Sequence, residues 1–111
     1  MIIGVTGDAG SGKDTVAEIL QEKGFVHISF SDLIREELRN RNMSITRDSL
    51  TVRGNELRAS YGADILAHLA LERMDRTKNY VLTSIRNPAE VHRLQEQPDF
   101  VLIKVTAAEE I

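Results

Sequence analysis

Short apolar runs alternate with amphipathic stretches along the chain. The apolar runs are rich in β-branched and aromatic residues, which predicts four buried strands over 2–6, 25–30, 80–85 and 100–105. Between them, apolar residues recur at helical spacing, which predicts helices over about 13–23, 31–41, 46–60, 65–74 and 88–95. Strands that alternate with helices form parallel crossovers, so the predicted fold class is α/β, with a parallel sheet of about four strands and helices on both faces.

Residues that start and stop helices fall at the borders of these stretches. Gly24 is placed to end the first helix, and Ser31 is a suitable N-cap for the second. Thr46 and Asp48 can open the third helix. Asn87 and Pro88, with Glu90 at the third helical position, are a strong start for the last one.

Composition narrows the class of protein. The 111 residues are 41% hydrophobic and 28% charged, which is typical of one globular domain spanning 1–111. A net charge of −3, with two Tyr, three Phe and no Trp, argues against a nucleic-acid or membrane surface. Cysteine is absent, and no apolar run has signal or transmembrane length, so we expect a cytoplasmic protein.

The sequence "GDAGSGKDT" joins the first strand to the first helix and fits the pattern G-x-x-x-x-G-K. Glycines let successive backbone N–H groups point inward at a helix N-terminus, where they form a cradle for an anion. The lysine then reaches the β- and γ-phosphates of a nucleotide. We therefore expect a nucleotide such as ATP to bind Gly7, Asp8, Ala9, Gly10, Ser11, Gly12, Lys13, Asp14 and Thr15.

One position departs from this pattern. The residue after the lysine is ordinarily Ser or Thr, whose hydroxyl binds Mg²⁺, whereas this chain has Asp14 followed by Thr15. A carboxylate also binds Mg²⁺, directly or through water, so both residues are candidate metal ligands. Alternatively, Asp14 is a first-turn acid that stabilises the helix dipole. Both interpretations stay open at this point.

Three charged residues lie near predicted strand ends, where ligands bind in open α/β sheets. Arg86 follows the third strand, and its position favours a role in binding. Asp32 could orient an acceptor hydroxyl, although it fits a first-turn helix acid at least as well. Arg35 lies one turn further on and either shares a face with Ser31 or faces solvent.

Three segments, "GDAGSGKDT", "SFSDLIREEL" and "SIRNPAEV", together resemble the P-loop nucleoside monophosphate kinase group, which includes adenylate kinase, deoxynucleoside monophosphate kinases and dephospho-coenzyme A kinase. The resemblance implies a three-layer P-loop fold that transfers the γ-phosphoryl group of ATP, with Mg²⁺, to a nucleotide-like or coenzyme-like small molecule. It implies catalytic roles for Lys13, Asp32 and Arg86. It places the acceptor on Asp32, Arg35, Arg58 and Arg86, of which Arg58 belongs to a recurring "LR..YG" phrase.

Two features depart from that group. Ser84 stands near the place where an acidic metal-binding residue is expected. The sequence also ends at "VTAAEEI", where members of the group continue into an arginine-bearing lid, so we expect the chain to be an N-terminal part of a longer protein. The alternative to a kinase is a non-catalytic nucleotide-binding module of a larger protein, such as the kinase-like part of some deoxycytidylate deaminases.

Overall fold

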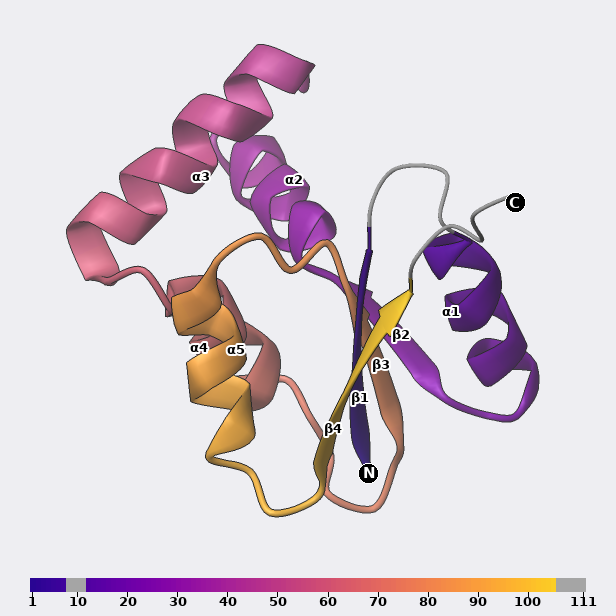
Figure 1. The fold of residues 1–111 in the computed structure, drawn as a ribbon. Helices are drawn as coiled ribbons and strands as arrows, with labels where there is room; N and C mark the ends of the chain where they lie inside the picture. Colours follow the sequence, from indigo (N-terminus) through magenta and orange to yellow (C-terminus); the bar gives the residue numbers. More distant parts are fainter. Residues whose placement is uncertain (8–11, 106–111) are drawn as a thin grey trace, which may run out of the picture.

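The computed structural model describes residues 1–7 and 12–105 (Figure 1). Its strands and helices alternate along the chain much as the apolar pattern predicts. In chain order they are β1 (Ile2–Gly7), α1 (Lys13–Glu22), β2 (Val26–Ser29), α2 (Phe30–Asn40), α3 (Arg47–Tyr61), α4 (Ile65–Glu72), β3 (Tyr80–Thr83), α5 (Pro88–Gln95) and β4 (Phe100–Val105). None of these helices is both long enough and apolar enough to cross a membrane.

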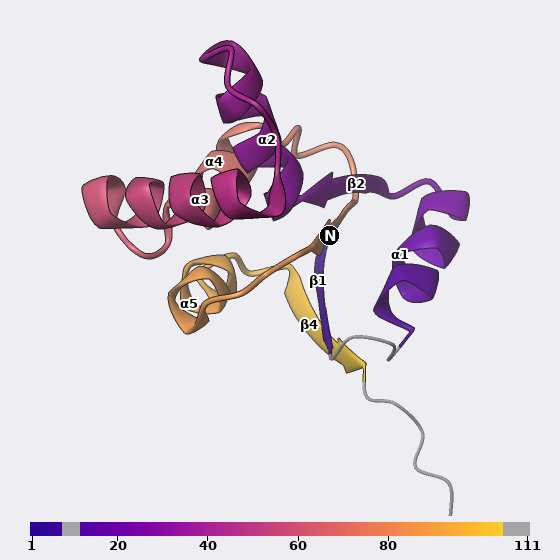
Figure 2. The ribbon, with the colours of Figure 1, turned by 90° about the horizontal axis from the view of Figure 1, so that it is seen from above.

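The four strands form one sheet in the order β2-β3-β1-β4, and every pairing between neighbours is parallel. Helix α1 covers one face of this sheet, and α4 and α5 lie on the other, with α2 and α3 further along that side (Figures 1 and 2). The predicted α/β class with helices on both faces is therefore confirmed. Because the strands are parallel, all their carboxyl ends meet at one edge of the sheet.

Each face of the sheet has its own apolar core. The smaller core lies under α1 and consists of Ile3, Val5, Ala17 and Val81. The larger core joins the opposite face to helices α2 to α5 through residues such as Ile2, Phe30, Leu66, Leu82 and Leu94. Alternate residues of β1 and β3 thus contribute to opposite cores, as expected for a sheet covered on both faces.

Strand β4 pairs with β1 alone within the described part of the chain. Its apolar residues are less buried than those of β1 and β3, and Val101 and Leu102 are 45% and 40% exposed. In the described residues, this continuous apolar run therefore forms an edge strand.

The second strand is shorter than predicted, and Ser31 is not the N-cap of the helix that follows. Strand β2 ends at Ser29, and α2 already begins at Phe30, which is fully buried in the larger core. Ser29 is the N-cap, but its side chain does not cap the helix because its hydroxyl hydrogen-bonds the Ser84 hydroxyl at 3.1 Å. The burial of Phe30 sets this boundary, and periodicity alone does not reveal it.

The third strand also ends early, at Thr83 instead of residue 85. Ser84 adopts a left-handed backbone conformation with φ +62°, which an extended strand cannot include. The other predicted caps are confirmed. Thr46 forms a capping box with Ser49, and the Asn87 side chain accepts a hydrogen bond from the Ala89 N–H at 2.8 Å.

Candidate functional site

Three helices begin at the carboxyl edge of the sheet. Helices α1, α2 and α5 follow β1, β2 and β3 respectively, so their N-termini gather beside the carboxyl ends of the strands. The first-turn N–H groups of a helix have no intrahelical acceptor and attract negative charge. This edge of the sheet is consequently suited to an anionic ligand.

The start of α1 carries the predicted phosphate-binding lysine. Lys13 is the first residue of the helix, and its Nζ donates a hydrogen bond to the Gly7 carbonyl at 3.2 Å, so the ammonium group reaches back to the end of β1. Gly12 precedes it with φ +92°, a left-handed conformation that favours glycine. Asp8, Ala9, Gly10 and Ser11 lie outside the described residues.

Asp14 and Thr15 occupy the first turn of α1, and both are exposed. Their side-chain oxygens are of the type that Mg²⁺ prefers, and this ion is commonly held by one or two carboxylates together with substrate phosphates. Within residues 1–7 and 12–105, no group of three or more His, Cys, Asp or Glu side chains could hold a metal by itself. Asp14 and Thr15 therefore fit a Mg²⁺ ion only if other ligands, such as phosphate or water oxygens, complete its coordination.

A cavity of about 530 Å³ opens at the same edge of the sheet, between α2, α3 and the segment after β3. Four of the residues that line it are arginines, and the remaining lining residues are polar or apolar and uncharged. The lining comprises Phe30, Ser31, Ile34, Arg35, Arg47, Leu50, Thr51, Asn55, Arg58, Leu66, Ser84 and Arg86. Four arginines with no carboxylate in the described lining give the cavity a chemistry suited to an anion, and two of them, Arg35 and Arg58, also pair with carboxylates outside the lining.

The structure brings three of the predicted residues together and leaves one apart. Arg35, Arg58 and Arg86 come from three separate segments, and all line the cavity. Asp32 does not line it, because its side chain is 67% exposed and is paired with Arg35 at 2.6 Å on the same helix. In this arrangement Asp32 is a surface partner of Arg35, and the predicted role in catalysis stays a prediction.

Sequence reasoning missed three polar residues of the cavity, Arg47, Thr51 and Asn55, which all lie on α3. Together with Arg58 they are spaced by four, four and three residues, so they share one face of the helix. The same periodicity test that identified the apolar faces could have found this polar stripe.

The end of β3 carries hydroxyl groups where an acid was expected. The Thr83 Oγ1 shares a hydrogen bond with His27 Nε2 at 2.6 Å, and the Ser84 Oγ lies 3.1 Å from the Ser29 Oγ. Thr83 is buried, whereas Ser84 lines the cavity. Both hydroxyls tie β3 to β2 at the carboxyl edge of the sheet, beside the cavity that Ser84 lines.

Glu90, on α5, is a buried carboxylate beside the cavity. It is fully buried, and its Oε1 accepts a hydrogen bond from the Arg86 N–H at 3.2 Å and pairs with Arg58 Nη2 at 3.5 Å. Burial raises the pKa of Glu90, and the Arg58 guanidinium and backbone N–H groups act in the opposite direction.

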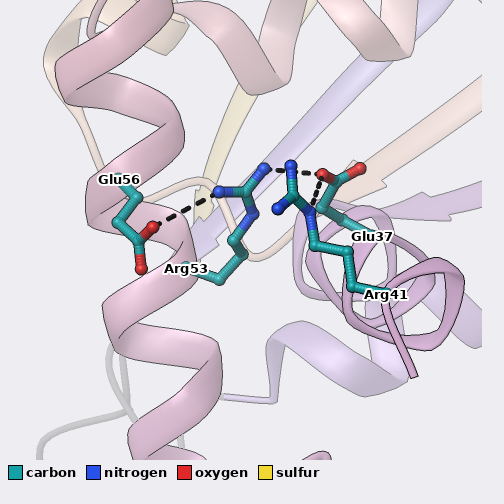
Figure 3. A network of polar contacts seen from close by, with 4 residues as sticks. All are labelled: Glu37, Arg41, Arg53 and Glu56. Atoms are coloured by element: carbon teal, nitrogen blue, oxygen red, sulfur yellow. Dashed lines mark hydrogen bonds and ion pairs between the residues drawn. The ribbon is translucent and has the colours of Figure 1, made fainter. Parts of the chain in front are cut away.

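An ion-pair network joins the two helices that carry most of the cavity's arginines (Figure 3). Arg53 of α3 contacts Glu37 of α2 at 2.6 Å and Glu56 of its own helix at 3.4 Å, while Arg41 also reaches Glu37 at 3.0 Å. The Arg53 side chain is only 13% exposed. Hydrogen bonds from Arg53 and Arg41 hold the pKa of Glu37 below its ordinary value of 4.5.

We expect Arg53→Met to lower the free energy of unfolding by about 1–2 kcal/mol, because it removes a largely buried hydrogen-bonded charge. The lowered pKa of Glu37 stabilises the fold above pH 4.5, and this contribution is lost as the pH falls through the lowered value. Urea unfolding measured between pH 7 and pH 3 should therefore show that the free energy of unfolding falls less with decreasing pH in Arg53→Met than in the unaltered chain.

The matched control is Arg41→Met, which removes a more exposed partner of the same carboxylate and should cost less than about 0.5 kcal/mol. Equal effects of the two substitutions would contradict the assignment of Arg53 as the link between α2 and α3.

The strand order, the lysine at the start of α1 and the cavity at the carboxyl edge define a P-loop kinase-like fold. The sequence profile of the AAA domain family matches residues 3–111, and the chain belongs to this family. A UPF0200 protein from Methanothrix thermoacetophila is 35% identical over 105 residues, which cover 94% of this chain and 58% of that protein. The chain thus spans little more than half the length of this relative.

Two solved structures resemble the fold. A proposed kinase from Chloroflexus aurantiacus superposes with a TM-score of 0.58 at 19% identity, covering 96% of this chain and 58% of that one. A mutant of the APS kinase CysC from Mycobacterium tuberculosis gives a TM-score of 0.52 at 23% identity, covering 95% of this chain and 74% of that one. At these identities the likeness establishes the fold, and the activity is argued from the site.

Proposed function

We propose that this protein is an ATP-dependent phosphotransferase that acts on a phosphate-bearing, nucleotide-like or coenzyme-like acceptor. The observation that carries this proposal is the cavity with four arginines, which opens at the same edge of the sheet as Lys13. A phosphoryl transferase needs a donor site and an acceptor site side by side, since its catalysis is mostly positioning and stabilisation of charge.

The donor would bind at the start of α1. Lys13 would move from the Gly7 carbonyl to the β- and γ-phosphates of ATP, and the first-turn N–H groups of α1 would donate hydrogen bonds to the phosphate oxygens. Asp14 and Thr15 would hold the Mg²⁺, which neutralises charge on the terminal phosphates when it is bound. An oxygen of the acceptor would attack the γ-phosphorus, the bond to the bridging β–γ oxygen would break, and ADP would leave. Where the attacking oxygen is a hydroxyl, its proton would pass to solvent or to a nearby carboxylate such as Asp32.

The acceptor would bind in the cavity. Its phosphate would be held by Arg35, Arg47, Arg58 and Arg86. A guanidinium group can donate two parallel N–H hydrogen bonds to two oxygens of the same phosphate. Thr51 and Asn55 would contact the uncharged part of the molecule. A cavity of about 530 Å³ falls in the range usual for small-molecule sites. When Arg35 turns to the acceptor it would release Asp32, which could then assist at the reacting centre.

The test is ADP formation by the purified protein with ATP, Mg²⁺ and a panel of nucleoside monophosphates, deoxynucleoside monophosphates and dephospho-coenzyme A. We expect turnover with at least one acceptor, and Arg86→Ala should raise the KM of that acceptor by about tenfold to a hundredfold with little effect on the KM of ATP. Arg39→Ala, an exposed arginine of α2 outside the cavity, is the matched control. Acceptor-independent ADP formation would contradict the proposal.

A second candidate is a nucleotide-binding module without turnover. It is favoured by the hydroxyl groups of Thr83 and Ser84 at the end of β3, where an acid would otherwise help to hold the metal. Binding of ATP that depends on Lys13, without ADP formation in any acceptor mixture, would support this module over the kinase.

A further inference from the structure

Glu90 has no place in the proposed chemistry, yet it lies where three parts of the site meet. Its carboxylate comes from α5, its ion-pair partner Arg58 comes from α3, and the N–H that it accepts belongs to Arg86 in the segment between β3 and α5. Both arginines line the cavity, whereas Glu90 itself does not. The carboxylate therefore lies outside the cavity lining, next to the Arg58 guanidinium and the backbone of Arg86.

The hydrogen bonding of this pair is incomplete in the described residues. The Glu90 Oε2 and the Arg58 Nε are both buried, and neither has a hydrogen-bond partner within residues 1–7 and 12–105. An apolar side chain at this position of α5 would pack without that cost, as Leu94 does one turn further on. A buried carboxylate at position 90 thus carries a penalty that packing alone does not explain.

We propose that Glu90 is a positioning residue, whose negative charge holds the Arg58 guanidinium in the orientation that receives the acceptor's phosphate. This inference rests on the proposed function, because it assigns Arg58 to the acceptor. Arg58 has a long side chain on α3, and without an ion-pair partner this side chain could adopt many rotamers. The pair with Glu90 reduces that freedom before the ligand arrives, which is the general basis of preorganised binding.

The Glu90→Gln variant removes the negative charge of this side chain and keeps its shape. A glutamine keeps an oxygen that can accept the Arg86 N–H bond, so the turn before α5 is preserved, while the charge that attracts Arg58 is lost. We expect the dissociation constant for inorganic phosphate, followed by NMR titration of the arginine signals, to rise about tenfold. The Arg58 Nε–H signal, which arises from a buried group, should broaden or shift in the free protein.

Glu96→Gln is the matched control, since Glu96 is an exposed glutamate at the end of the same helix, 4.0 Å from Arg93. It should leave both readouts unchanged. If Glu90→Gln does not fold, the comparison of Arg58→Gln with Arg58→Gln/Glu90→Gln replaces it, because neither of these variants leaves the Arg58 guanidinium without its partner. The two should bind phosphate equally, since Glu90 acts through Arg58.

Two results would overturn the inference. The first is an unchanged Arg58 signal and unchanged phosphate affinity in Glu90→Gln. The second is a further tenfold loss when Glu90→Gln is added to Arg58→Gln, which would mean that Glu90 affects phosphate binding by a route other than Arg58. Failure of the proposed function has a different signature. Phosphate would then perturb none of the four arginines in the unaltered protein, while the Arg58 signal of the free protein would still report on Glu90.

Discussion

Lys13→Met should weaken ATP binding by about a hundredfold, because a charge-assisted contact to phosphate of about 3 kcal/mol is removed. The Lys13 Nζ has only the Gly7 carbonyl as a hydrogen-bond partner in the described residues, so its charge is available to a polyphosphate. Methionine has a similar length and helix propensity, which leaves α1 intact. Isothermal titration calorimetry with ATP and Mg²⁺, together with ADP formation, measures the effect.

Lys23→Met is the matched control, since this lysine lies exposed at the opposite end of α1. It should leave ATP affinity and ADP formation within about twofold of the unaltered protein, because an exposed charge remote from the ligand is screened by solvent and salt. A tight ATP complex that survives Lys13→Met would place the nucleotide away from the start of α1, and the proposed donor site would be wrong.

Phe30→Ala should lower the free energy of unfolding by about 3–5 kcal/mol, the range found when a fully buried aromatic side chain is deleted. Phe30 is 0% exposed, begins α2 and packs in the larger core. It also lines the arginine cavity, so its loss should loosen the start of the helix that carries Arg35. Urea unfolding gives the stability change, and phosphate titration gives the effect on the cavity.

Tyr61→Ala is the control for Phe30→Ala, because Tyr61 is an aromatic residue that is 68% exposed at the end of α3. It should cost well under about 1 kcal/mol, as surface substitutions usually do. A loss of stability for Phe30→Ala no larger than for Tyr61→Ala would contradict the central position of α2 in the larger core.

The architecture could be predicted from the sequence because the spacing of apolar residues shows which elements are buried on one face and which on both. Apolar runs predict the four strands, and helical stripes predict the five helices of the described residues, with borders within a few residues. The borders that differ depend on tertiary contacts. Phe30 joins α2 because the core buries it, and β3 stops at Thr83 because Ser84 turns to meet Ser29. Neither contact is visible in a local pattern.

The candidate site was predictable to a similar degree. Strand ends and motif spacing led to Lys13 and Arg86, since parallel topology places such positions at one edge of the sheet, and the family resemblance added Arg35 and Arg58. The pairing of Asp32 with Arg35 and the placement of Glu90 beside Arg58 depend on side-chain orientation and on packing between helices distant in sequence. Only the three-dimensional arrangement settles which charges neutralise one another and which face the cavity.

The link between α2 and α3 through Arg53 and Glu37 has a consequence for ligand capture. It ties together the two helices that carry Arg35, Arg47 and Arg58, while Arg86 lies on the segment that follows β3. Like charges across an empty gap repel, and a dianion between them reverses the sign of that force. A bound phosphate would therefore relieve the mutual repulsion of the four arginines, and the arrangement of α2 and α3 beside the sheet should be more stable when the cavity is occupied.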